Sequence, residues 1–599
     1  MTLTSNVLAV LVFFNAFANH LTPVSVGACT VFAVGKKATK DGSVIVSHSD
    51  DGDPDNDARL LYVPGKRHTQ GSLRPIFYTA ESFPRYLGYA RGPAYEPNQD
   101  TQGYNISEPI GYIEQVPHTF GYQSSTYGVI NEHGVAVGES TCGAMFGTCG
   151  KGSTVGCEPG RGVGEALMSI DTLSYLAMER CRSSREAVEM MGKFATRYGF
   201  YGPPDSFEGS GESLVVGDPD EAWAFQILSD PTGTSAIWAA KRLPDTDMTV
   251  VANMFTIRDV DPKDRANFIL SPNLFDIARA HGWWKDGEPF DFTKMYSGGE
   301  YSHKYYSGRR MWGGFRRAAP SVKLPDTYKD IRYTPVYPWS LKPDRLVTPW
   351  DVMAWHRDLY AGTKYDMTKG LQAGPFGSPD RFATVSKNVT GHWERSIALY
   401  RTNAVYVQHL HHASYDRPAG TASVAWYGAG AAHYAAFVPV PSGVTRTLRP
   451  LQFATPRKFE ATSMNWVVRR VMEVCQIRWD RMHLLVEAAQ QEVEEWGETL
   501  LAKLRHNVAS GHGDSEATSF LLNKAIEKHA ERVLERWRRL AMEELFEYSD
   551  NTFIPNGRPL GYPDAWLKGV GYKNGPPAAP IEDQCPPDCT PSTAGAVIV

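Results

Sequence analysis

The sequence has little that would hold it in a membrane or draw it to nucleic acid. Outside residues 7–18, no apolar run approaches the ~20 residues that a helix needs to cross a bilayer. Basic residues are not in excess, since 61 Lys and Arg stand against 66 Asp and Glu and the net charge is −5. We therefore expect no membrane span and no nucleic-acid partner.

Several catalytic and cofactor-binding motifs are also missing. The chain has no phosphate-binding loop, no Gly-x-Ser-x-Gly elbow and no His-Glu-x-x-His. His409 and His411 would share one face of a strand, but no Cys, Asp or Glu lies at a known metal-site spacing from them, which favours polar packing. We expect no metal and no organic cofactor.

The acidic run at residues 50–57 does not fit a calcium loop. Counted from Asp51, the sixth position of an EF-hand template holds Asn56 and the twelfth holds Tyr62 instead of a bidentate Glu. A solvated acidic loop is the usual explanation of such a run. A functional alternative is that Asp50 or Asp53 binds the α-ammonium group of a peptide substrate.

The eight cysteines are few for a chain of 599 residues. Three of them cluster in a spacing that is not a zinc pattern, and two lie in a Pro-rich tail: Cys142, Cys149, Cys157, Cys585 and Cys589. In an exported protein we expect some of them to pair, and the sequence leaves the pairing open.

Residues 1–28 resemble a signal peptide or a propeptide. Residues 8–18 (LAVLVFFNAFA) form an apolar core, and small residues precede Cys29, so a cut after Ala28 fits the small-residue rule for cleavage. The segment before the apolar core has no Lys or Arg. The prediction is a secreted or lumenal protein whose mature chain begins at Cys29.

The same residues allow a competing interpretation. Residues 26–29 (VGAC) also resemble a bacterial lipobox, in which lipid is attached to the cysteine thiol and the protein becomes anchored to a membrane. Lipid on Cys29 would remove it as a nucleophile. The chain would then be a surface-anchored binding protein and not an enzyme.

Short β-rich runs joined by turn residues predict several antiparallel hairpins. The runs are residues 29–35 with 43–48, 127–131 with 135–141, and 213–217 with 222–228, followed by runs at 235–240 and 249–253. Between them, residues 165–179 suit a helix, and Ser183 with Glu186 has a capping-box pattern before a second helix. This order predicts an α+β fold with sheets packed on each other and covered by helices.

The remaining segments define the predicted domain organisation. Residues 60–125 and 270–345 are rich in Pro, Gly, Tyr and Trp and read as long loops or lids. Apolar residues recur at helical spacing over 462–548, which predicts a helical hairpin split near residues 511–513. We therefore divide the chain into a catalytic domain (29–455), a helical extension (456–550) and a Pro/Gly-rich tail (551–599).

Cys29 is the candidate nucleophile. A cysteine at a free N-terminus carries a thiol with a pKa of about 8.5 and an α-amine with a pKa of about 7.7–8.0, so one residue supplies a nucleophile and its base. The alternative is that Cys29 is an ordinary cysteine in a disulfide, and its position alone does not separate the two.

A family resemblance favours the nucleophile. Residues 29–51 (CTVFAVGKKATKDGSVIVSHSDD) look like the start of the dipeptidase A/secernin family of cysteine N-terminal-nucleophile (Ntn) hydrolases. Further blocks are similar in the same order: residues 127–141 (YGVINEHGVAVGEST), 217–223, 251–253, and 362–379. The similarity extends over roughly residues 29–550, and several ordered blocks are more specific than one motif.

The resemblance implies a four-layer αββα sandwich and amide-bond hydrolysis. In the wider superfamily an Arg and an Asp follow on the second strand, and those places fall on His48 and Asp51 here. Asp51 would orient the Cys29 thiol and amine, whereas His48 departs from the pattern and suits a polar strand-end residue. The Asn253 side chain and the backbone near Thr141 would donate hydrogen bonds to the oxyanion.

An arginine is expected to complete the site, and the sequence does not choose among Arg381, Arg395 and Arg401. The predicted function is an exported cysteine dipeptidase that acts through a thioester at Cys29. One alternative is an amidase or acylase acting on N-acyl amides, with the aromatic loops lining an acyl pocket. Another is a non-enzymatic, secernin-like or lipid-anchored protein.

Overall fold

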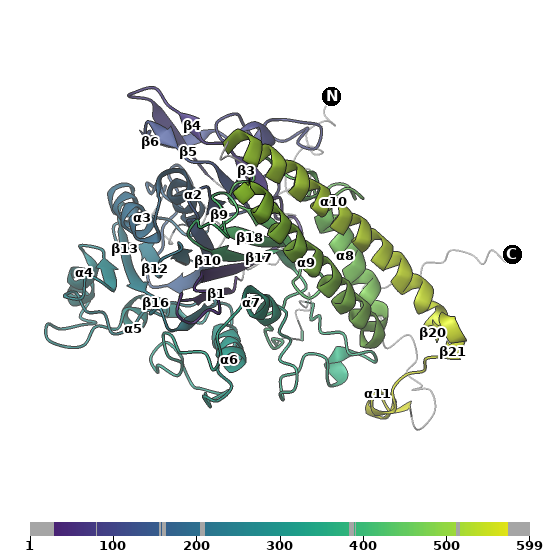
Figure 1. Cartoon of the computed structure of the whole chain (residues 1–599). Coiled ribbons are helices and arrows are strands. Elements are labelled where there is room, and N and C mark those ends of the chain that lie inside the picture. Colours follow the sequence, from purple (N-terminus) through teal and green to yellow (C-terminus); the bar gives the residue numbers. More distant parts are fainter. Residues whose placement is uncertain are drawn as a thin grey trace, which may run out of the picture.

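The computed structural model describes residues 29–78, 81–154, 157, 163–203, 210–382, 388–389, 391–510 and 515–572. The predicted leader (1–28), the split of the helical hairpin near 511–513, and Cys585 and Cys589 lie outside the described residues. Over the described part, two antiparallel sheets form the centre of the molecule and helices surround them (Figure 1). The predicted α+β class, with antiparallel sheets and separate helices, is confirmed.

The first sheet is six-stranded and carries Cys29 at the start of one strand. Its order is β14 (Met248–Val251), β1 (Val31–Val34), β2 (Val44–Asp51), β17 (Thr402–Leu410), β18 (Val424–Ala429) and β19 (Val438–Pro441). The predicted hairpin at 29–48 is present as β1 and β2, with Ala33 opposite Val46.

The second sheet is nine-stranded. Its order is β15 (Phe268–Leu270), β13 (Ala236–Arg242), β12 (Ala222–Ser229), β11 (Gly211–Gly217), β10 (Ala136–Ala144), β9 (Gly128–Asn131), β8 (Tyr122–Ser124) and β3 (Leu61–Val63), while β16 (Ser297–Gly299) pairs with β10. The predicted hairpins β9–β10 and β11–β12 are both found.

Alternate residues of each strand point to opposite sides, and the two sheets pack face to face. On β1, Val31 and Ala33 join a core cluster with Val215 of β11, whereas Phe32 and Val34 belong to a different cluster on the other side. The sheets approach closely at Gly138 of β10, where a Cβ would lie 2.5 Å from the Ser47 carbonyl oxygen. A side chain at 138 would push β10 away from β2.

Helices cover the outer face of the nine-stranded sheet. α2 (Ile170–Arg180) and α3 (Ser184–Tyr198) pack on Leu214 and Val216 of β11. As the sequence predicts, Ser183 caps α3 by accepting a hydrogen bond from the Glu186 amide. Helices thus form one outer layer.

The outer face of the six-stranded sheet is covered by α6 (Ser307–Ala318) and α7 (Pro349–His356). Thr348 caps α7 in a capping box with Asp351. In α6, Gly314 allows close approach to the sheet, since a Cβ there would lie 2.7 Å from the Phe32 ring. Helix, sheet, sheet and helix therefore follow one another through the molecule.

The prediction of long loops at 60–125 and 270–345 is wrong in part. The first segment contains β3, β8 and the short pairs β4 (Lys66–Arg67) with β7 (His118–Thr119) and β5 (Leu73–Phe77) with β6 (Pro109–Glu114). The second contains α4 (Leu274–Ala280), α5 (Phe292–Tyr296), β16 and α6. Their aromatic residues fill cores around these short elements, which explains the absence of one clear period.

Three C-terminal helices lie along one side of the molecule. They are α8 (Met464–Cys475), α9 (Trp479–Ser510) and α10 (Ser515–Glu547), and α9 and α10 run side by side in Figure 1. Their apolar faces share one core cluster with β17–β19. A short pair, β20 (Thr552–Phe553) with β21 (Arg558–Pro559), and α11 (Asp564–Gly569) follow.

The described helices include none that is both long enough and apolar enough to span a membrane. A disulfide joins Cys149 and Cys157, whereas Cys29, Cys142, Cys181 and Cys475 are free and buried.

Candidate active site

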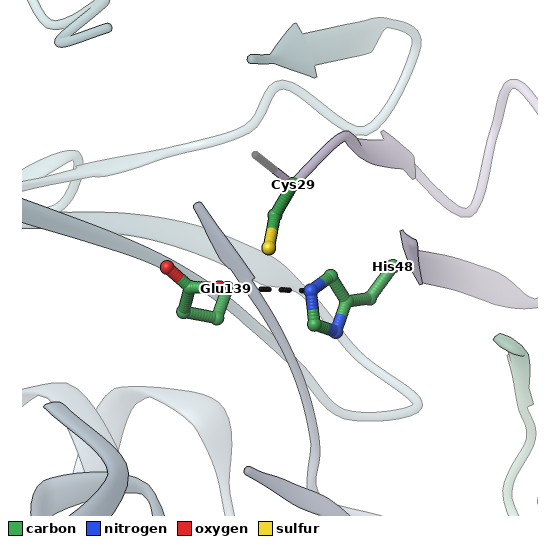
Figure 2. A group of neighbouring side chains, drawn as sticks. All are labelled: Cys29, His48 and Glu139. Carbon is green, nitrogen blue, oxygen red and sulfur yellow. Dashed lines mark ion pairs between the residues drawn. The ribbon is translucent and has the colours of Figure 1, made fainter. Parts of the chain in front are cut away.

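Cys29 lies two residues before β1 and is buried. Its Sγ, a ring nitrogen of His48 and a carboxylate oxygen of Glu139 lie within 4.8 Å of one another. Figure 2 shows the thiol directed toward the gap between the imidazole of β2 and the carboxyl group of β10. The site thus joins the two sheets where they meet.

Hydrogen bonds fix the backbone of Cys29 from two sides. Its carbonyl oxygen accepts a bond from Nη1 of Arg310 at 2.7 Å and one from Oγ of Ser140 at 3.3 Å. Arg310 is fully buried on α6, and its Nη1 also reaches Oγ1 of Thr30 at 3.0 Å. Burial lowers the pKa of Arg310 to about 10, which leaves it cationic at neutral pH.

Asn253, two residues after β14, forms hydrogen bonds with the same two side chains, Arg310 and Ser140. Its Oδ1 accepts a bond from Nη2 of Arg310 at 2.6 Å, and its backbone N–H donates to Oγ of Ser140 at 2.7 Å. Its Nδ2 donates to the carbonyl oxygen of Thr141 at 2.6 Å. Asn253 has a φ of 53°, a left-handed conformation that asparagine tolerates better than most residues.

Buried carboxyl groups surround the thiol. Oγ1 of Thr141 donates to Oε1 of Glu139 at 3.0 Å, and Oγ1 of Thr126 donates to Oδ2 of Asp50 at 2.8 Å. Burial raises the pKa of Glu139 and of its neighbour Glu212, and it raises that of Asp50 to about 7. Charged carboxylates so close together and so dry also repel one another, which disfavours the ionised form of each.

The same buried environment shifts the pKa values of the Cys29 thiol and the His48 imidazole, and both shifts favour the neutral form. Burial raises the pKa of Cys29 well above its usual value, and the charges of Glu139, Asp50 and Asp51 raise it further. Burial lowers the pKa of His48 to about 3, so its imidazole is neutral. Its Nδ1 lies 2.7 Å from the Tyr406 hydroxyl and its Nε2 lies 3.6 Å from Glu139.

Asp51 ends β2 and contacts partners other than the thiol. Its Oδ2 accepts bonds from Nη2 of Arg395 at 2.6 Å and Oγ of Ser49 at 3.2 Å, and its Oδ1 accepts one from Oγ1 of Thr402 at 2.5 Å. Among the described contacts, Asp51 therefore acts on Cys29 through its charge and not through a direct hydrogen bond.

Two expectations about this region are corrected. His48 is not a strand-end residue, because it lies inside β2 and is fully buried. The acidic run is a solvated loop only in its middle, where Asp55 is exposed, since Asp50 and Asp51 belong to β2 and Asp57 is buried between Arg59 and Arg85.

The structure also shows what each of the three candidate arginines contacts. Arg395 meets the Asp51 carboxylate, Arg401 reaches the carbonyl oxygens of Asp51 and Gly52, and Arg381 contacts carbonyl oxygens that include that of Ser378. Sequence reasoning missed Arg310 because its segment read as a loop. It also gave no role to Glu139, although that residue stands inside a block quoted for the resemblance.

Comparison with known proteins gives one family. The model of "Peptidase family C69" matches residues 112–492, a stretch that begins downstream of Cys29. A protein named "Probable dipeptidase" from Latilactobacillus sakei is 22% identical over 484 residues, covering 80% of this chain and 87% of the relative.

Two other relatives are similar in extent. A "Probable dipeptidase" from Salmonella dublin is 23% identical over 458 residues, covering 75% of this chain and 90% of the relative. "Dipeptidase A" from Lactobacillus helveticus is 23% identical over 443 residues, covering 73% and 80%.

Proposed function

Since the chain belongs to peptidase family C69, the family of its dipeptidase A relatives, we propose that it is a cysteine dipeptidase with Cys29 as an N-terminal nucleophile. On this proposal the helix–sheet–sheet–helix order is that of the Ntn hydrolases. One observation carries the assignment: the only described thiol that lies beside both an imidazole and a carboxyl group is the one that follows the predicted cleavage point.

Removal of residues 1–28 would activate the thiol. While those residues are attached, the Cys29 nitrogen is an amide, and burial together with three acidic neighbours raises the pKa of the thiol. Cleavage after Ala28 would create an α-ammonium group three bonds from Sγ. A positive charge so close stabilises the thiolate, so processing and activation would be one event.

The reaction would follow the course of an acyl transfer. The Cys29 thiolate attacks the peptide carbonyl carbon, and the tetrahedral intermediate expels the amine, which takes a proton from the α-ammonium group, to leave a thioester on Cys29 and a neutral α-amine. Water, deprotonated by the α-amine, hydrolyses the thioester. The second N–H of the Asn253 amide, whose first is bonded to Thr141, would donate to the oxyanion, and Arg310 holds that amide in place.

Substrate recognition is proposed for the buried acidic end of β2. A dipeptide carries a free α-ammonium group, and Asp50 is a carboxylate near the thiol with a pKa raised to about 7. A substrate ammonium would favour its charged form. Equal KM values for wild type, Asp50→Asn and Asp53→Asn would remove this part of the proposal.

Export through residues 1–28 is likewise a proposal, resting on the apolar core and the small residues before Cys29. A secreted or lumenal location follows from it. Secretion of the chain, and its retention inside the cell when residues 8–18 are deleted, are the expected results.

The test compares free and N-acetylated dipeptides as substrates of wild type and Cys29→Ala. We expect hydrolysis of free dipeptides by the wild type alone and a thioester adduct on Cys29 in an acid-quenched mass spectrum. Preference for the N-acetylated compounds would indicate an amidase or acylase instead. Equal hydrolysis by Cys29→Ala would exclude Cys29 as the nucleophile.

A further inference from the structure

A second group of imidazole and carboxylate side chains lies at the other end of β2. Nε2 of His409 and Nε2 of His411 each lie 3.0 Å from Oδ2 of Asp41, and the two nitrogens lie 2.9 Å from each other. The sequence pattern offered no carboxylate for this pair. The fold supplies one, because the turn between β1 and β2 places Asp41 beside the end of β17.

Hydrogen bonds alone do not account for this triangle. The Nε2 of an imidazole has one outward direction in the ring plane, which carries either one hydrogen or one lone pair. Each Nε2 can therefore form a well-aligned hydrogen bond with the carboxylate or with the other imidazole, but not with both. Two nitrogen atoms and one oxygen atom that face one another in this way are suited to coordinating one shared cation.

The three separations match the geometry of a metal site. Two ligands at right angles, each ~2.1 Å from one metal ion, lie about 3.0 Å apart, whereas tetrahedral ligands lie about 3.4 Å apart. The observed values of 3.0, 3.0 and 2.9 Å fit three neighbouring positions of an octahedron. Two His and one carboxylate on one face, with the remaining positions open, is a known arrangement for transition metals.

The donors are held in place and reach solvent. Oδ1 of Asp41 accepts a bond from Oγ of Ser43 at 2.7 Å, which turns Oδ2 toward the imidazoles. The Asp41 side chain is 31% exposed, which leaves room for water at the open positions.

The site is separate from Cys29. His409 lies opposite Ile45 on β2. Thr30, which follows Cys29, pairs with Ser49, four positions further along β2, which is about 13 Å. An ion here would join the β1–β2 turn to the end of β17.

Two nearby arginine side chains would repel a bound metal ion. Nη2 of Arg417 lies 2.9 Å from Oδ2 of Asp41, and Arg505 is close enough to feel the charges of both. The Arg417 side chain is 25% exposed, so it can turn toward solvent when an ion takes the carboxylate. Its removal should strengthen binding.

We propose that Asp41, His409 and His411 form a binding site for a divalent transition-metal ion, of which Zn²⁺ is the probe, that fastens the β1–β2 turn to β17. The inference does not depend on the proposed peptidase function.

The experiment is Zn²⁺ titration by calorimetry of the untagged, chelator-stripped full chain in a Cys29→Ala background. That background removes the thiol that lies beside His48 and Glu139. We expect one site per chain, a Kd raised at least about tenfold by His411→Ala and by Asp41→Asn, and an unchanged Kd in His412→Ala. His412 is the matched control, because it is the adjacent histidine and faces Asp220.

The variant Arg417→Ala and the melting temperature provide two further tests. Arg417→Ala should lower the Kd, and Zn²⁺ should raise the melting temperature of the wild type but not that of Asp41→Asn. Equal Kd values in wild type, Asp41→Asn and His411→Ala would overturn the proposal. So would the absence of binding in the wild type at millimolar Zn²⁺.

Discussion

Two groups beside β2 contain the same kinds of side chain in opposite environments. In the first group, His48 and Glu139 lie 3.6 Å apart and are both fully buried beside Cys29. In the second group, His409 and His411 lie 3.0 Å from an Asp41 that is partly exposed. Burial raises the pKa of Glu139, whereas hydrogen bonds and nearby histidines hold the pKa of Asp41 well below its usual range.

This difference shows that the surroundings, and not the residue type, decide what such a group does. A dry carboxyl group among other carboxyl groups keeps a proton and can pass it to a neighbour. A wetted carboxylate beside two imidazoles keeps its charge and can hold a cation. The four predictions below test the buried end of this comparison, in order of decreasing effect.

The largest effect is expected from Cys29→Ala. Without Sγ no thioester forms, so kcat/KM for dipeptides should fall at least about 10³-fold. The control is Cys475→Ala, a free buried thiol on α8, which should keep activity. Steady-state kinetics with free dipeptides measure both. Loss of activity in both variants, or in neither, would contradict a specific role for Cys29.

Glu139→Gln should lower kcat/KM by about 10²-fold, because a proton-transfer group beside the thiol is lost. Since the Glu139 charge raises the pKa of Cys29, the same variant should shift the pH profile of thiol alkylation to lower pH. Glu544→Gln makes the same change at a buried carboxyl group on α10 whose pKa is also raised, to about 9. An identical alkylation profile in wild type and Glu139→Gln would remove Glu139 from the site.

Arg310→Lys should lower kcat/KM by about tenfold. Lysine keeps the charge but not the planar fork that bonds the Cys29 carbonyl and the Asn253 side chain together. Arg316→Lys, on the same helix and bonded to Asp358, is the matched control. We expect the loss mainly in kcat, and a change confined to the melting temperature would make Arg310 purely structural.

The smallest effect concerns the pH dependence of stability. The folded pKa of Asp50 is about 7, above the unfolded value of about 3.9, so its contribution is full below pH 4 and is lost as pH rises toward 7. In the chain that retains residues 1–28, Asp50→Asn should therefore raise the free energy of unfolding at pH 8 by on the order of 1–3 kcal/mol. The gain should vanish near pH 4 in denaturant titrations.

Asp57→Asn is the opposite control. Arg59 and Arg85 lower the pKa of Asp57, so its stabilisation is present above pH 4 and is lost as pH falls. That variant should be less stable than wild type at pH 8. Equal responses of the two variants would mean that the contrast in their surroundings has no energetic consequence.

Local patterns predicted the parts of the fold that local residues determine. The β1–β2, β9–β10 and β11–β12 hairpins follow from β-rich runs and turn residues, and the Ser183 cap follows from its side chain. The helix α6 was missed because Gly313 and Gly314 weaken its pattern. They are required by contact with Tyr360 and Phe32, which are distant in sequence.

The site shows the same limit. Cys29 and Asn253 could be named from sequence blocks, yet the contact of Arg310 with Cys29 joins residues 281 positions apart. His48 matches no local rule, because its burial depends on β10 and β17. Asp41 could not be assigned to His409 before the pairing of β2 with β17 was known.

Catalysis by an N-terminal Cys29 requires that the active protein begin at this residue. The most direct measurement is intact-mass and N-terminal analysis of the protein fraction that hydrolyses dipeptides. We predict a chain that starts at an unmodified Cys29 and whose activity is lost on alkylation of that residue. Activity in a chain that retains residues upstream of Cys29, or that carries lipid on its thiol, would exclude Cys29 as an N-terminal nucleophile.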